Sequence, residues 1–239
     1  MCIYIKMETV RKLHNDAKRA LIHAVVATGA CKRALDVGCG RGGDLNKWKQ
    51  THVSHVDMCD PDAESLAEAK SRAKNMGITN VRFYAGDISA CPNVKYDAVC
   101  YNFSLHYIFE NEKLFFNTIH NIKKRLKIGG KLFGCIPDSD RLIMMKNCTM
   151  CDTHGNYFIM KNNAGLGNFG EKVLVFLADT PFFGSKPNLE PIAYKDLLIT
   201  HLSNLGIILE SWEPLVAATD SVPGEEITKM YSKFIFVNK

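Results

Sequence analysis

ALDVGCGRGGD, residues 34–44, is the stretch of the sequence that decides the fold. An apolar run leads into glycines at positions 38, 40, 42 and 43, which satisfy the pattern G-x-G-x-x-G. In α/β proteins such a turn joins a buried strand to a helix, and a cofactor lies at the amino end of that helix. The stretch therefore predicts a cofactor site, and the residues around it must say which cofactor it takes.

Predicted strands and helices alternate along most of the chain. The strands are expected at residues 33–37, 52–59, 81–85, 96–101, 131–136, 206–212 and 231–237, and the helices at 44–50, 62–75, 111–126 and 194–205. This alternation predicts an α/β fold with a doubly wound, mostly parallel, seven-stranded sheet, which is Rossmann-like.

We expect a single domain over residues 1–239. It comprises an N-terminal helix (10–28), a cofactor-binding core (33–136), an insertion (137–190) and a C-terminal helix with strands (191–239). In the insertion the pattern predicts a helix at 139–146, an irregular stretch at 148–156 and short strands at 157–161 and 173–177.

Composition narrows the class of protein. Nine cysteines without the spacing of a disulfide framework predict a reducing, intracellular compartment. No apolar run reaches the roughly 18 residues of a membrane helix, and the start of the chain lacks a signal-peptide pattern. The net charge of +5 is compatible with a polyanionic partner and does not establish one.

Acidic residues select among the cofactors. Asp36 and Asp44 flank the glycine turn, which opposes a pyrophosphate and suits S-adenosylmethionine, a donor with a sulfonium and an ammonium group. Asp60 ends the next strand, where an acid can accept from ribose hydroxyls, and Asp87 follows the third strand, where it can accept from an adenine amino group. Acids after three successive strands favour a methyltransferase.

Two motifs together carry a resemblance to a known family. LDVGCGRGGDLNKW (35–48) and VCYNFSLHYIF (99–109) resemble the mRNA cap (guanine-N7) methyltransferase family. The helix at 12–22 and the strand at 230–239 are similar to its terminal motifs. Asn102, Leu105 and the pair Asn15-Asp16 depart from the commonest family residues. The departures favour a divergent member, with a viral origin among the alternatives, either as a free protein or as the methyltransferase domain of a capping enzyme.

The resemblance implies a role for each matched position. The donor site would comprise Lys18, Asp36, Gly38, Cys39, Gly40, Asp60, Asp87, Ile88, Asn102 and Tyr107. The cap site would comprise His106, Tyr107, Pro137, Glu190 and Tyr231, with the Tyr231 ring on the guanine face. The resemblance also implies capped RNA as the partner, with triphosphatase and guanylyltransferase domains or subunits as further candidates.

The chemistry implied by the resemblance needs no catalytic side chain. Guanine N7 already carries a free lone pair, so the chain has only to align the reacting atoms, with His106 and Tyr107 nearest the acceptor. Basic candidates for the phosphates are Lys18, Arg19, Arg41 and Lys47. No metal is expected, because Cys148, Cys151 and His154 lack a second ligand pair at zinc spacing.

Two alternatives stay open. A methyltransferase acting on a small molecule or a protein would share the glycine turn, Asp60 and Asp87, but would not need the guanine-binding set. A noncatalytic stimulatory subunit would keep the fold, and a degraded glycine turn would be its expected sign.

Overall fold

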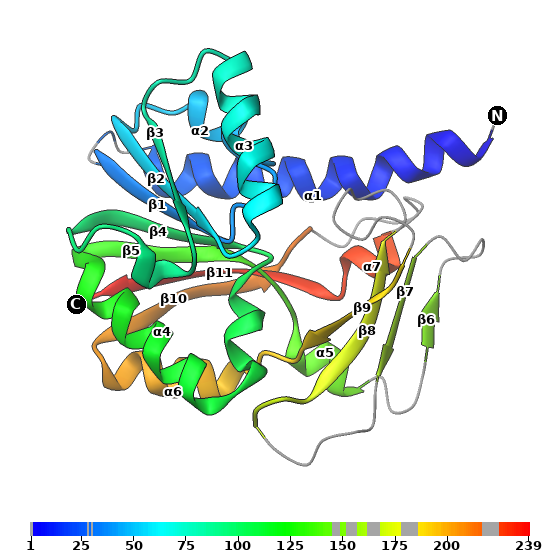
Figure 1. The fold of residues 1–239 in the computed structure, drawn as a ribbon. Coiled ribbons are helices and arrows are strands. Elements are labelled where there is room, and N and C mark those ends of the chain that lie inside the picture. Colours follow the sequence, from blue (N-terminus) through cyan, green and yellow to red (C-terminus); the bar gives the residue numbers. More distant parts are fainter. Residues whose placement is uncertain are drawn as a thin grey trace.

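The computed structural model describes residues 2–27, 29, 31–144, 149–151, 157–161, 168–177, 186–216 and 225–239. The chain builds a seven-stranded sheet in the order β10-β11-β5-β4-β1-β2-β3. Its first five strands are parallel, and β11 runs antiparallel to both β5 and β10 (Figure 1). The predicted doubly wound, mostly parallel, seven-stranded sheet is confirmed.

The strands of this sheet begin and end close to the predicted positions. They are β1 (Arg33–Val37), β2 (His55–Asp60), β3 (Val81–Ala85), β4 (Tyr96–Asn102), β5 (Leu126–Pro137), β10 (Ile207–Pro214) and β11 (Tyr231–Asn238). The largest difference is β5, which starts earlier than the pattern suggests. The two glycines at 129 and 130 are typical of a helix end, and the apolar side chain of Ile128 is exposed, so no alternation of apolar and polar residues marks the start of this strand.

Helices cover both faces of the sheet. One face carries α1 (Cys2–Val26), α2 (Leu45–Lys49) and α3 (Ala63–Asn75), which share one buried apolar cluster. The other carries α4 (Glu112–Arg125) and α6 (Lys195–Asn204), which share a second cluster. Successive residues of a strand point to opposite faces, so Ala34 joins the first cluster and Leu35 the second. Helix α1 starts well before the predicted residue 10.

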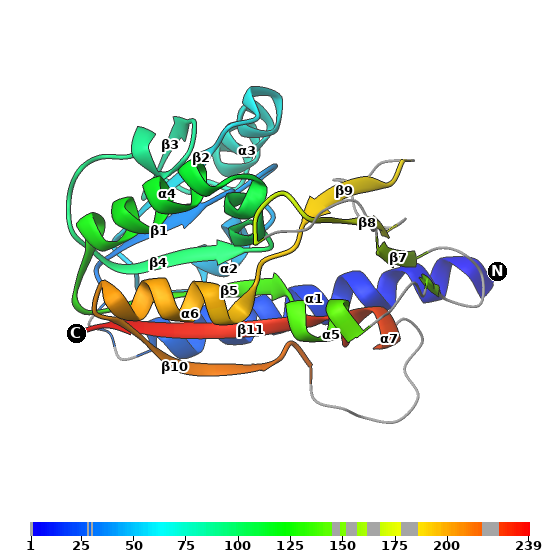
Figure 2. The same ribbon diagram turned by 90° about the horizontal axis from the view of Figure 1, so that it is seen from below.

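A second, antiparallel sheet is inserted after β5. It has the order β6-β7-β8-β9 and lies beyond the end of the main sheet (Figures 1 and 2). Its strands are β6 (Thr149–Cys151), β7 (Tyr157–Lys161), β8 (Lys172–Leu177) and β9 (Asn188–Pro191), preceded by α5 (Ser139–Met144). The strands at β7 and β8 are confirmed, whereas β6 falls in a stretch predicted to be irregular and β9 was not predicted.

Three short helical segments complete the chain: η1 (Ile88–Ala90), η2 (Leu105–Glu110) and α7 (Glu225–Thr228). None was predicted, because a segment of one or two turns shows too little periodicity. The structure contains no helix, within the described ranges, that has both the length and the hydropathy to cross a bilayer.

Candidate active site

The glycine turn brings three strand ends together. The amides of Gly38 and Cys39 donate to the Cys59 carbonyl at 2.8 and 3.0 Å, so the turn after β1 is held against the end of β2. Gly38 has φ +73°, and a Cβ placed on it would lie 2.4 Å from the Cβ of Ser104, which follows β4. Only glycine allows this conformation together with this close approach. The two sequence motifs and the end of β2 therefore meet where the parallel strands end.

Asp60 fixes the geometry of this turn. Its Oδ2 accepts from the Gly40 amide at 2.7 Å and its Oδ1 from the Asp62 amide at 2.9 Å. The side chain is largely buried, with the residue 8% exposed. A carboxylate has about four lone-pair positions, so two remain for a ligand. The structure therefore places Asp60 where it could hold hydroxyl groups beside the glycine turn.

Asp87 and Ile88 follow β3 at the same end of the sheet. The Gly86 amide donates to the Asp60 carbonyl at 3.0 Å, which ties this segment to the end of β2. Asp87 is exposed and caps η1 by accepting from the Ser89 amide at 2.8 Å, while Ile88 is buried. The structure thus brings Asp60 and Asp87 to neighbouring strand ends, as the sequence predicts.

A buried charge cluster lies under the glycine turn. Lys18 from α1 and Lys47 from α2 both place Nζ 2.8 Å from Asp44 Oδ1, and the Asn102 amide donates to Asp44 Oδ2 at 2.8 Å. Burial opposes the charge on Asp44, but the two ammonium groups outweigh it and lower the pKa of this carboxyl. Burial also lowers the pKa of Lys18, and Asp44 more than restores it, so the net shift is upward.

Asp36 occupies the other side of this cluster. It accepts from the Trp48 indole N–H at 2.9 Å. Burial raises the pKa of Asp36, and the nearby negative charge of Asp44 raises it further. The argument from two acids flanking the turn is therefore wrong for Asp44, whose charge is balanced by Lys18 and Lys47.

Lys47 is also unsuited to the predicted phosphate role. Its side chain is only 3% exposed, and Nζ bonds to the Asn15 side chain and the Gly43 carbonyl, each at 2.9 Å. Lys47 lies in α2, directly after the glycine turn, and its side chain points into the protein. The sequence pattern does not show which way this side chain points.

The predicted guanine-binding residues come together from distant parts of the chain. His106 and Tyr107 lie in η2 after β4, and Glu190 lies in β9 of the second sheet. The Tyr107 hydroxyl donates to Glu190 Oε1 at 3.2 Å, and His106 Nε2 lies 3.4 Å from Glu190 Oε2. Burial raises the pKa of Tyr107, and the charge of Glu190 raises it further. Carboxylate, imidazole and phenol groups thus converge on one place.

His106 has unsatisfied hydrogen-bonding capacity. The residue is 1% exposed, and neither ring nitrogen has a hydrogen-bond partner among the described residues. The side-chain oxygen of Asn102 also has no hydrogen-bond partner among the described residues. An unmet buried polar group costs about 1–3 kcal/mol, so these atoms indicate a polar ligand at this place.

Tyr231 and Pro137 are paired residues of β11 and β5. The Tyr231 ring is buried and meets the rings of His14 and Phe103 edge-on, at centroid distances of 5.2 and 5.4 Å. Burial raises the pKa of Tyr231, and Glu190 raises it further. Tyr231 therefore lies in the same neighbourhood as the cluster around Glu190.

Sequence reasoning missed two residues here. His14 stacks on Phe103 at 5.2 Å, and Phe103 has φ +58°, a conformation that is rare for a bulky residue and concentrates at functional sites. His14 could have been found, because it lies one helical turn before Lys18 on the same face of α1. The strained backbone of Phe103 leaves no mark in the sequence.

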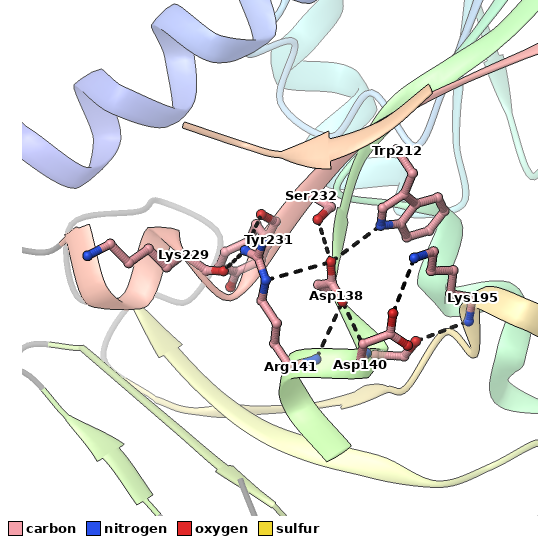
Figure 3. A network of polar contacts seen from close by, with 9 residues as sticks. Asp138, Asp140, Arg141, Lys195, Trp212, Lys229, Tyr231 and Ser232 are labelled. Carbon is pink, nitrogen blue, oxygen red and sulfur yellow. Dashed lines mark hydrogen bonds and ion pairs between the residues drawn. The ribbon is translucent and has the colours of Figure 1, made fainter. Parts of the chain in front are cut away.

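Asp138 anchors the ends of β5 and β11 beside this aromatic group. Its Oδ2 accepts from the Ser232 hydroxyl and, at 3.3 Å, from the Trp212 indole N–H, and its Oδ1 accepts from the Asp140 amide at 3.0 Å (Figure 3). Because Asp138 follows Pro137 and Ser232 follows Tyr231, the network holds both predicted cap residues in register.

The described residues contain no group of three or more His, Cys, Asp or Glu side chains that could hold a metal ion. Cys148 and His154 lie outside the described residues, as does the side chain of Cys151, so the structure does not test the expectation for that motif.

Comparison with known proteins decides the family. The model of the mRNA (guanine-N(7))-methyltransferase domain matches residues 4–163, more than half of the chain. The chain belongs to this family. The resemblance carried by the two sequence motifs is thereby confirmed.

Named relatives agree. The mRNA cap guanine-N(7) methyltransferase of Cryptococcus neoformans is 33% identical over 150 residues, which cover 57% of this chain and 21% of that protein. The enzyme of Saccharomyces cerevisiae is 33% identical over 144 residues (55% and 33%), and that of Caenorhabditis elegans 33% over 146 residues (55% and 37%). The matched part of the chain spans 21–37% of the length of these relatives. They are fungal and nematode proteins, so they give no support to a viral origin.

Solved structures agree on the fold. An S-adenosylmethionine-dependent methyltransferase from Clostridium acetobutylicum has a TM-score of 0.66 at 18% identity, covering 93% of this chain and 91% of that one. The N-methyltransferase NodS of Bradyrhizobium japonicum, in complex with S-adenosyl-l-homocysteine, has a TM-score of 0.58 at 15% identity, covering 95% and 86%. The fold is that of S-adenosylmethionine-dependent methyltransferases.

Proposed function

We propose that this chain transfers a methyl group from S-adenosylmethionine to N7 of the guanine cap of mRNA. Membership of the cap methyltransferase family supports the reaction. The observation that carries the choice of acceptor is the buried cluster of Glu190, Tyr107 and His106, in which neither imidazole nitrogen has a hydrogen-bond partner among the described residues.

The cluster offers the groups that guanine needs. Guanine presents an N1–H and an exocyclic amine, which require an acceptor, and a carbonyl oxygen, which requires a donor. Glu190 supplies carboxylate oxygens and His106 an imidazole N–H. Tyr231 supplies an aromatic ring, and stacking of one base on such a ring contributes about 1–3 kcal/mol.

The donor half of the site fits an adenosine cofactor. Asp60 keeps free lone pairs for ribose hydroxyls, and Asp87 with Ile88 lies one strand further along for the adenine. Lys18, Asp36, Gly38, Cys39 and Gly40 border the place for the methionine part, with Asn102 and Tyr107 completing it. When bound, S-adenosylmethionine supplies an electrophilic methyl group on a sulfonium.

The residues of this chain then act by holding the reactants in line. Guanine N7 has no proton to lose, so neither His106 nor Tyr107 needs to act as a base. Alignment of two bound reactants in a site that excludes water can supply an effective molarity of roughly 10⁵ M or more. The buried positions of His106 and Glu190 are consistent with such a dry site.

One experiment tests the reaction. Purified protein is incubated with labelled S-adenosylmethionine and RNA that begins with GpppN, and the product is digested with nucleases to identify the methylated atom. Label at guanine N7 supports the proposal. Label on another atom, or on a small molecule or protein, favours the first alternative, and donor binding without turnover favours a stimulatory subunit.

Capped RNA as the partner, and an intracellular reducing compartment, belong to this proposal. The six cysteines whose side chains are described are buried and unpaired by disulfides, which supports a reducing environment. Triphosphatase and guanylyltransferase partners, and a viral origin, stay predictions.

A further inference from the structure

The segment from Asp87 to Cys91 carries the two residues assigned to adenine, and the buried side chain of Arg125 donates hydrogen bonds to two of its carbonyl groups. Arg125 ends α4, and its Nη2 donates to the Cys91 carbonyl at 3.0 Å and to the Ser89 carbonyl at 3.3 Å. Its Nη1 donates to the Asn121 side chain at 2.5 Å, one helical turn earlier. The guanidinium therefore joins α4 to the segment that follows β3.

Burial of the Arg125 guanidinium is unfavourable in free energy. The residue is 4% exposed, and the three oxygens that accept from it are all neutral carbonyl oxygens. Removing a cation from water is expensive, and among the described residues no carboxylate accepts from Arg125 and its Nε has no hydrogen-bond partner. An apolar side chain at this position of α4 could be buried without this desolvation penalty. The cost indicates that the placement of Ser89 and Cys91 matters.

Those two carbonyls lie directly after Asp87 and Ile88. Asp87 caps η1 through Ser89, so the Asp87 carboxylate and the Ser89 carbonyl belong to one rigid turn. A hydrogen bond weakens steeply with distance and angle, so a small tilt of this turn would misdirect the carboxylate. Arg125 is buried against the carbonyls of this turn, whereas Asp87 is exposed.

We propose that Arg125 is a positioning residue that fixes the Asp87–Cys91 turn and thereby sets the selectivity of the donor site for adenine. The inference rests on the proposed function, since it takes Asp87 to accept from the 6-amino group of the donor. A 6-oxo base would instead direct a lone pair at the carboxylate. Selectivity between the two bases therefore reports the position of Asp87.

The test compares two ligands by calorimetric titration: S-adenosylhomocysteine and its 6-oxo analogue, S-inosylhomocysteine. One charge-assisted hydrogen bond separates them, so we expect the wild type to bind the adenine form about 10- to 100-fold more tightly. In Arg125→Met the ratio of the two affinities should fall to about threefold or less. Arg125→Lys keeps the charge and a single donor nitrogen, so it should give an intermediate ratio. It also allows the inference to be tested if Arg125→Met does not fold.

Asn238→Ala is the matched control. Asn238 is buried and donates to the Leu126 and Lys127 carbonyls at 3.0 and 2.9 Å, immediately beyond Arg125 in the chain but away from the Asp87 turn. It should lose stability and keep the wild-type ratio. A merely structural role for Arg125 would lower both affinities equally, as any loss of folded protein does.

Three results would overturn the inference. The ratio could stay at the wild-type value in Arg125→Met or Arg125→Lys. The wild type could bind S-adenosylhomocysteine without discriminating against the 6-oxo form, which would leave the proposed function standing. The wild type could bind neither ligand, in which case the donor half of the proposed function fails first.

Discussion

The donor and acceptor halves of the candidate site differ in how completely their polar groups are satisfied. In the donor half, both oxygens of Asp60 accept backbone amides at 2.7 and 2.9 Å. In the acceptor half, the contacts of Glu190 with Tyr107 and His106 are longer, at 3.2 and 3.4 Å, and both His106 nitrogens lack a hydrogen-bond partner among the described residues. The backbone thus fixes the Asp60 carboxylate of the donor half without a ligand, whereas no hydrogen bond among the described residues fixes the His106 ring of the acceptor half.

The difference follows from how each half is built. The donor half consists of neighbouring parallel strands and their turns, and the ladder between β1 and β2 sets its geometry. The acceptor half joins η2 to a strand of the inserted sheet, so residues 83 positions apart must meet. A guanine between them could satisfy the atoms that the protein leaves unpaired. Apart from Tyr107, which is assigned to both halves, substitutions in one half should therefore affect one ligand and spare the other.

The largest effect is expected for Asp60→Ala. The change removes an acceptor for ribose and also frees the Gly40 and Asp62 amides, each at a cost of about 1–3 kcal/mol if it stays buried. Affinity for S-adenosylhomocysteine should fall by about 100-fold or more. Affinity for GpppG should change by less than about threefold. Calorimetric titration of each ligand measures both.

Asp62→Ala is the control for Asp60→Ala. Asp62 is the adjacent acid, is exposed and caps α3 by accepting from the Ser65 amide at 2.6 Å. It should cost stability of about 1 kcal/mol and leave donor affinity nearly unchanged. If Asp62→Ala weakened donor binding as much as Asp60→Ala, Asp60 would have no particular role.

Glu190→Ala should have the next largest effect and the opposite selectivity. Losing the acceptor for the guanine N1–H and amine should weaken GpppG binding by about 10- to 100-fold, with donor affinity unchanged. Glu190→Gln keeps one carbonyl acceptor and should retain part of the affinity. Equal losses for both ligands would mean that the two halves are coupled, and the comparison between them would fail.

Much of the donor half could be predicted from the sequence because its signals are local. The glycine turn, Asp60 and Asp87 each sit at a strand end, and parallel strands bring such ends together. Family resemblance supplied Glu190, but nothing in the pattern predicted strand β9, which is four residues long and contains a proline. The pairing of Asp44 with Lys18 was missed too, since it depends on how α1 crosses the sheet.

His14 shows what the sequence analysis overlooked in the acceptor half. Because His14 lies close to lysines and an arginine on a helix, the pattern predicts that it belongs to the solvent-exposed face of that helix. In the structure His14 is buried, stacks on Phe103 and meets Thr228 Oγ1 at 3.3 Å. Burial, together with the charge of Lys18, lowers the pKa of His14 to about 3. That shift predicts how the stability of this half depends on pH.

The direction of this pH dependence follows from the pKa of His14 in the folded and unfolded states. Between the unfolded pKa of about 6.5 and the folded pKa, only the unfolded chain binds a proton at His14, so stability is present above pH 6.5 and is lost as pH falls. The loss attributable to His14 should be about 1.4 kcal/mol per pH unit below pH 6.5. His14→Gln should remove this component. The difference in free energy of unfolding between wild type and His14→Gln, measured in urea from pH 5 to 8, should shrink toward acid by that slope. A constant difference would show that folding does not lower the pKa of His14.

The smallest effect is expected for the pH dependence of the single-turnover rate, and it tests the mechanism. An acceptor with a free lone pair needs no base, so the single-turnover rate at saturating donor and cap should show no ascending limb near about pH 6 to 7, the range of an ordinary histidine. His106→Asn keeps a donor near Glu190 and should retain turnover within about tenfold of the wild type. A quenched-flow series from pH 6 to 9 measures both enzymes. An ascending limb in the wild type that disappears in His106→Asn would identify His106 as a base. It would then argue against guanine N7 as the acceptor, because a general base is needed only when the acceptor must lose a proton.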